Sequence, residues 1–194
     1  MAFDIFGVFL DALNFARKNR KKSALILIAG TAMLSFATGL FSHFVFALLI
    51  VAELVVAFFV GELDLKKIGL ELVTFITVLA GVVYGPLAGA VMGIVLLMLH
   101  FVLTRNLGPY VAYCIPAMGV IGLIAGYASS FGAVGTDIAV FGVMLSLLYN
   151  LITGGLGSLM LNDFFEELVW SGSNFALNFV LFSAFAPVIL SVLL

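Results

Sequence analysis

The chain has 194 residues, of which 64% are hydrophobic and 9% are charged, and its formal net charge is −2. Its mean hydropathy is +1.33, and apolar runs cover most of its length. This composition is typical of an all-α, multi-pass membrane protein and excludes a soluble domain with a large core. The charges sit in a few short segments, and we expect no nucleic-acid partner. The single cysteine, Cys114, excludes an intrachain disulfide and a cysteine-rich metal site.

Residues 1–22 are predicted to form an amphipathic helix followed by a basic anchor. Polar or glycine positions recur at intervals of three and four from Asp4 to Lys18, and phenylalanine and leucine occupy the other face. Such a helix lies in the plane of the bilayer, and the basic cluster at residues 17–22 favours an anionic cytoplasmic leaflet. The acids precede the apolar part, unlike in a signal peptide. A soluble helix docked on the bundle is the alternative.

Residues 23–194 are predicted to form a single transmembrane bundle of six or seven helices. Thr136 or Asp137 can cap the sixth span, Pro187 bends the last one, and a short interfacial helix at residues 161–170 precedes a cap at Ser173. The predicted spans are residues 23–41, 44–60, 68–84, 87–103, 110–128, about 137–159 and 174–192.

The basic residues indicate the orientation of these spans. If seven spans alternate and the N-terminus is cytoplasmic, all eight lysine and arginine residues fall on the cytoplasmic side of the cell membrane. The C-terminus then lies outside. If residues 44–60 do not cross, or residues 68–103 cross once, the second half of the chain inverts.

A glycine stripe with a proline at its centre marks the middle of the chain. Gly81, Gly85, Gly89 and Gly93 recur every four residues, so on a helix they form a face without side chains, over which backbones can touch. Pro86 removes a backbone donor and clashes with the preceding turn, so the helix is expected to break there into two spans. A single kinked span that only packs is the alternative.

This stretch resembles the signature of substrate-binding S components of energy-coupling factor transporters, the membrane subunits that capture vitamins and related micronutrients. The resemblance implies a bundle of six helices with a ligand cavity. It also implies a vitamin-like substrate and a separate energising module, made of a transmembrane scaffold subunit and an ATPase pair. The matching residues are Ala80, Gly81, Tyr84, Gly85, Pro86, Gly89, Ala90 and Gly93.

Polar side chains within spans are candidates for ligand contact, because lipid makes them costly elsewhere. Amides suit a neutral or heterocyclic ligand, and aromatic rings can stack on a flat one. The asparagines can equally bond helix to helix, the glutamic acid can be protonated and bonded to a neighbour, and the histidine and aromatic residues can be interface anchors. The candidates are Asn150, Asn178, Asn174, Trp170, Glu53, His100, Tyr84 and Tyr113.

Two other functions are compatible with the sequence. A membrane scaffold would use the glycine face to pack against partners. A lipid-modifying enzyme could hold Mg²⁺ with the carboxylates of Asp163, Glu166 and Glu167. No nucleophile–base spacing, phosphate-binding loop or dinucleotide motif is found, and the histidines have no acidic partners nearby in sequence. We therefore expect a non-enzymatic protein without a metal or cofactor.

Overall fold

The computed structural model describes residues 40–132, 137–161 and 164–193. The predicted in-plane helix, the basic anchor and nearly all of the first predicted span lie outside these residues. Almost all of the described part belongs to one compact unit, Phe46–Leu194.

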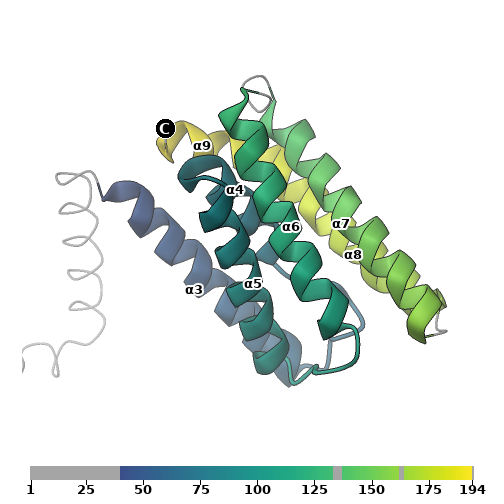
Figure 1. Ribbon diagram of the computed structural model, residues 1–194. Coiled ribbons are helices and arrows are strands. Elements are labelled where there is room, and N and C mark those ends of the chain that lie inside the picture. The colour runs from purple at the N-terminus through teal and green to yellow at the C-terminus, as the bar shows by residue number, and fades with distance from the viewer. Residues whose placement is uncertain (1–39, 133–136, 162–163, 194) are drawn as a thin grey trace, which may run out of the picture. The chain divides into compact units, whose positions relative to one another are not determined.

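The described residues form helices and no strand, as predicted (Figure 1). Five helical stretches are long and apolar enough to cross a membrane: residues 41–62, 86–103, 111–130, 138–159 and 164–193. The chain is therefore a multi-pass helical membrane bundle. The elements are α3 (Phe41–Glu62), α4 (Val73–Tyr84), α5 (Pro86–Leu103), α6 (Val111–Ser130), α7 (Ile138–Leu161), α8 (Phe164–Val180), the π-helical turn η1 (Leu181–Phe185) and α9 (Ala186–Leu193).

The last helix runs without interruption, so the prediction of a short interfacial helix followed by a new span was wrong. Ser173 does not cap a helix; it lies inside α8, and its hydroxyl donates to the Val169 carbonyl at 2.7 Å. A serine can make this bond within a helix, so its presence does not require a helix start. Close before Pro187, where a bend was predicted, the helix contains the π-helical turn η1, in which the Ala186 N–H donates to the Leu181 carbonyl five residues earlier.

The third predicted span is also shorter than expected. Helix α4 begins at Val73 instead of residue 68 and has 12 residues, or about 18 Å, against a hydrocarbon core of about 30 Å. Every residue from Val73 to Gly81 is buried. Helix α4 is therefore an interior helix, packed against α5, α6, α7 and α9.

The predicted break at Gly85-Pro86 is confirmed. Gly85 has a φ of 95°, in the left-handed region, and Pro86 is the first residue of α5. Helices α4 and α5 then pack together against α6 over glycines. A Cβ added at Gly89 would lie 2.6 Å from the Gly81 Cα, and one at Gly122 would lie 2.3 Å from the Gly89 carbonyl carbon.

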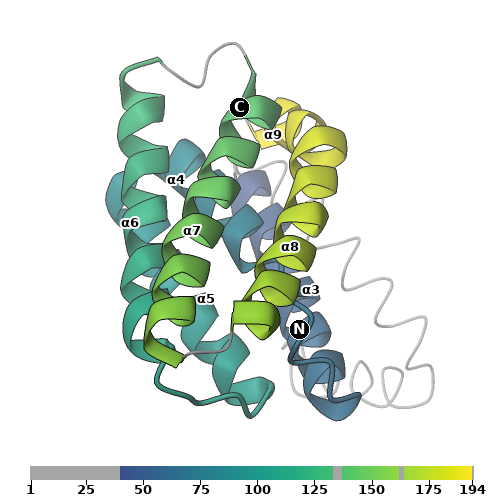
Figure 2. The ribbon, with the colours of Figure 1, turned by 90° about the vertical axis from the view of Figure 1, so that its right-hand side faces the viewer.

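The segments that connect the helices lie at the two ends of the bundle (Figure 2). The connections from α3 to α4 and from α5 to α6 lie at the same end as the start of α8. At the other end, Asp137 begins α7 as predicted, because its carboxylate accepts from the N–H groups of Ala139 at 3.0 Å and Val140 at 3.2 Å.

We expect Gly122→Ala to lower the free energy of unfolding by about 1–3 kcal/mol, because the new methyl group overlaps the Gly89 backbone. Gly155→Ala in α7 is the matched control, since a Cβ there meets nothing within 4 Å. Thermal unfolding in detergent, followed by circular dichroism, measures the difference. Equal melting temperatures for the two variants would contradict this account of the packing.

Candidate functional site

A non-helical stretch, residues 65–72, enters the bundle between α3 and α4. Its inner end reaches the level of Glu53, which lies nine residues, or about 14 Å, from the end of α3. The Leu72 N–H donates to the Glu53 carboxylate at 2.6 Å. The Gly69 N–H donates to Ser173 at 3.0 Å, and its carbonyl accepts from the Asn174 amide at 3.2 Å. Side chains of α3 and α8 thus satisfy backbone groups that no helix satisfies.

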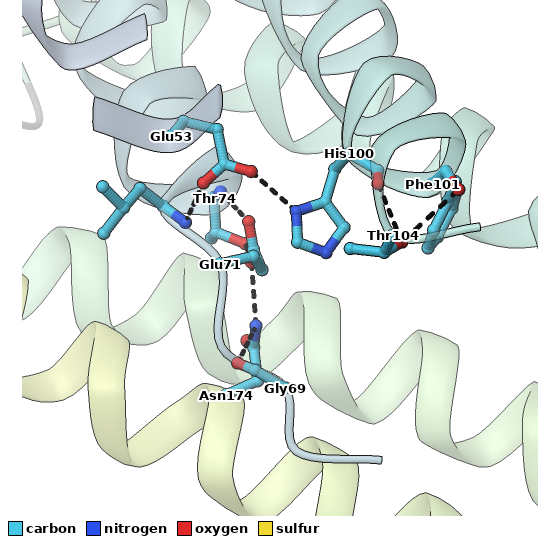
Figure 3. Close-up of polar contacts among 9 residues, drawn as sticks. Glu53, Gly69, Glu71, Thr74, His100, Phe101, Thr104 and Asn174 are labelled. Carbon is cyan, nitrogen blue, oxygen red and sulfur yellow. Dashed lines mark hydrogen bonds and ion pairs between the residues drawn. The ribbon is translucent and has the colours of Figure 1, made fainter. Parts of the chain in front are cut away.

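Glu53 and His100 form a buried pair (Figure 3). The second carboxylate oxygen of Glu53 lies 2.6 Å from His100 Nδ1, and which of the two donates depends on where their shared proton resides. Thr104 donates to the His100 carbonyl at 2.8 Å and closes the last turn of α5. The pair therefore joins the middle of α3 to the last turn of α5.

Glu71 is the centre of the second half of this polar network. Its side-chain oxygens accept from the Thr74 N–H at 3.0 Å and from the Thr74 hydroxyl at 2.7 Å, so Glu71 satisfies an N–H group in the first turn of α4. It also accepts from the Asn174 amide at 2.8 Å. Glu71 is not among the residues predicted from the sequence, although an acid that directly precedes a long uncharged run is a signal for such a role.

The three asparagines meet in this network. The Asn150 side chain donates to the side-chain oxygen of Asn174 at 2.9 Å, and Asn178 donates to the Asn174 backbone carbonyl at 3.0 Å. All three are buried. They therefore bond α7, α8 and residues 69–71 to one another. None of the three lines the cavity that is described next, which lies at the end of the bundle.

This cavity, of about 400 Å³, lies where α3 and α5 finish and α8 begins. Two of the predicted ligand residues, Tyr113 and Trp170, line it. Its wall combines aromatic rings, small polar groups and charges. The lining residues are Asp64, Lys66, Lys67, Phe101, Asn106, Tyr110, Tyr113, Cys114, Thr153, Glu166, Glu167 and Trp170.

Two ion pairs lie in the cavity wall, which also contains the carboxylate of Glu167. Lys66 lies 3.3 Å from Asp64, and Lys67 lies 3.3 Å from Glu166 of α8. Glu167 packs on the backbone of α7, where Gly157 leaves room: a Cβ there would lie 2.4 Å from the Glu167 carboxylate carbon. A glycine in α7 thus permits a carboxylate in the wall.

Tyr110 lies just before α6 and closes one side of the cavity. Its hydroxyl donates to the Asn106 carbonyl, which ties the loop between α5 and α6 to the start of α6. Burial raises the pKa of this phenol to about 12, so at neutral pH it is uncharged and acts as a donor.

The remaining predicted residue, Tyr84, lies outside the cavity wall, and its ring centroid is 4.9 Å from that of Phe46. Most cavity residues were not predicted, because they lie in loops and at helix ends instead of among the polar groups of the spans. A signal was nevertheless present. Alternating spans place residues 61–67, residues 104–108 and the start of the last helix on one side, where their charged and aromatic residues can meet.

Comparison with protein-family models, with curated proteins and with solved structures gives no match for this chain. Within the described ranges, no three histidine, cysteine, aspartate or glutamate side chains are grouped as metal ligands. The arrangement provides a cavity with a polar and aromatic lining. The buried hydrogen-bond network around Asn174 lies beside it and holds the loop that carries Lys67 against α8.

We expect Asn174→Ala to lower the free energy of unfolding by about 1–3 kcal/mol without any ligand, because Gly69, Glu71 and Asn150 each lose a buried hydrogen-bond partner. Asn178→Ala removes bonds to Asn174 alone and is expected to cost less. Thermal unfolding of the two purified variants tests this. A larger loss for Asn178→Ala would contradict the central place of Asn174.

Proposed function

We propose that this protein is a membrane-embedded subunit that captures a small, vitamin-like molecule in the cavity between α6, α7 and α8. The observation that carries the proposal is the cavity itself. Its volume of about 400 Å³ lies in the range of about 300–1,000 Å³ that is usual for small-molecule sites. Aromatic rings for stacking and a few polar groups for orientation are the usual lining of such sites.

The resemblance of residues 75–93 to S components supports the same function. It also suggests that the protein works together with other subunits. The chain has no phosphate-binding loop, so energy for transport would come from another polypeptide. A transmembrane scaffold subunit with an ATPase pair is the arrangement that the resemblance implies.

The packing of the glycine stripe favours capture over a scaffold role. Gly81 and Gly89 face α6 of the same chain, where added Cβ atoms would lie 2.8 Å and 2.7 Å from the Gly122 carbonyl oxygen. A stripe that is covered within the chain offers no surface to a partner helix. The buried asparagines, by contrast, are compatible with both roles, because they hold the bundle together whether or not a ligand binds.

Ligand binding is expected to stabilise the protein by about 2.7 kcal/mol at a ligand concentration one hundred times Kd. The ligand can be found by mass spectrometry of small molecules that co-purify after gentle extraction. Tyr113→Ala is expected to weaken its binding about tenfold by removing an aromatic wall. Tyr127→Ala, on an exposed position of the same helix, is the control. No co-purifying molecule, and no stabilisation by a broad panel of vitamins and bases, would contradict capture.

The side of the membrane that the cavity faces can be tested separately. Among the described lysine and arginine residues, Lys66 and Lys67 line the cavity, and Arg105 pairs with Glu62 at the end of α3. The positive-inside rule therefore favours a cytoplasmic location for this end of the bundle. The described state would then release ligand to the cytoplasm in an uptake cycle, and loading would require exposure of the same cavity to the other side.

In a Cys114→Ser background, we expect an impermeant maleimide added to intact cells to label Asp137→Cys and not Asp64→Cys. Both positions are exposed, and they lie at opposite ends of the bundle. Labelling after the cells are opened shows that each introduced thiol is reactive. Labelling of Asp64→Cys alone in intact cells would reverse the orientation.

A further inference from the structure

One residue of the cavity wall, Asn106, narrows the class of ligand in the proposed capture function, on which this inference rests. The sequence predicted a neutral or heterocyclic ligand from the amides of Asn150, Asn174 and Asn178. In the structure these three asparagines bond one another and Glu71, and they do not line the cavity. Asn106, which was not among the predicted residues, does line it.

The backbone of Asn106 is held on both sides. Its N–H donates to the Phe101 carbonyl at 2.9 Å, and its carbonyl accepts from the Tyr110 hydroxyl. Arg105, directly before it, has a φ of 52°, in the left-handed region that residues other than glycine rarely adopt. Such a conformation costs free energy and persists only where the surrounding structure maintains it. The chain after α5 is therefore shaped to present residue 106 at one defined position.

The side-chain amide of Asn106, by contrast, has no hydrogen-bond partner in the described part of the chain. The bonds of this residue involve its main chain alone, and the side chain is partly exposed and lines the cavity. An amide group carries a donor and an acceptor in one plane. It can therefore make two parallel hydrogen bonds to a ligand that offers an acceptor beside a donor, as asparagine does with the edge of adenine.

Aromatic rings add flat apolar surfaces to the same cavity. Tyr113 of α6 and Trp170 of α8 both line it. The Trp170 ring is supported by an edge contact with the buried Tyr149, at a centroid distance of 6.4 Å. Phe101 and Tyr110 form another part of the wall, with ring centroids 5.4 Å apart. Rings that are held in this way can stack on a flat group.

We infer that the ligand is a flat heterocycle with a hydrogen-bond donor next to an acceptor on its edge, as in a lactam or an imide. The Asn106 amide binds this edge, and the rings of Tyr113 and Trp170 contact the faces of the heterocycle. Asn106 is then the residue that distinguishes such a ring from an apolar ring of similar size.

Uracil and its N,N′-dimethyl derivative test this assignment on the purified protein in neutral detergent. Both have the same ring and the same carbonyl groups, but methylation removes the N–H donors. Trp170 is the only tryptophan of the chain and lines the cavity, so its fluorescence reports binding when it is excited at a wavelength that pyrimidines hardly absorb. We expect a saturable change with uracil at a Kd about tenfold below that of dimethyluracil. Apolar burial alone would give the opposite order, because the methyl groups add apolar surface.

Asn106→Leu keeps the approximate size of the side chain and removes both hydrogen-bonding groups. We expect it to weaken uracil binding about tenfold and to abolish the preference over dimethyluracil. Leu107→Ala is the matched control and should leave the preference unchanged, because Leu107 lies in the same loop, is exposed and does not line the cavity. If Asn106→Leu does not fold, the ranking of the two probes on the unaltered protein still decides the question.

Equal or tighter binding of dimethyluracil would overturn the inference and leave the capture function standing. The same holds for an unchanged preference in Asn106→Leu, and for the absence of a saturable response to either probe. Failure of the capture function is a different result, namely the absence of any co-purified or stabilising molecule. The two proposals therefore fail in distinguishable ways.

Discussion

The constraint on which this structure depends is the need to satisfy the non-helical backbone of residues 69–72 inside a helical membrane bundle. Non-helical backbone at membrane depth is tolerated only where protein groups replace the missing helical hydrogen bonds. Glu53 accepts from the Leu72 N–H, Ser173 accepts from the Gly69 N–H, and Asn174 donates to the Gly69 carbonyl. These bonds join the non-helical residues 69–72 to α3 and to α8, although their partners are 19 to 105 residues apart in sequence.

The buried ionisable side chains determine how the helices are positioned relative to one another more than they raise the free energy of unfolding. Taking Glu53, His100 and Glu71 out of water is costly, and apolar side chains of similar volume often stabilise a core as well or better. A polar pair, however, accepts only a geometry in which its partners meet. The 2.6 Å contact between Glu53 and His100 therefore helps to determine how far α5 is shifted along α3.

The parts of the fold that could be predicted are those that depend only on neighbouring residues in the sequence, such as the length of an apolar helix that crosses lipid. Apolar length defines α3, α5, α6 and α7, Gly85-Pro86 ends one helix and begins the next, and Asp137 caps α7. The start of α4 and the continuity of α8 could not be predicted in this way. Residues 68–72 are mostly apolar in either conformation, and the bonds that hold them unwound come from distant residues. Tyr113 and Trp170 were predicted to contact a ligand and do line the cavity, but its charged wall comes from loops that only the fold brings together.

The network and the cavity are physically linked through Gly69. A Cβ at this position would lie 2.5 Å from the Trp170 carbonyl oxygen and 2.7 Å from the Asn174 Cβ, so the chain is pressed onto α8 directly beside a cavity residue. Lys67 precedes Gly69 by two residues and reaches Glu166 one turn before Trp170. The bonds that anchor Gly69 therefore also determine where the lysines meet the carboxylates of the cavity wall. Polar residues in the spans thus shape the cavity indirectly: they hold the loop that carries the lysines, and this loop and the aromatic residues form the cavity wall.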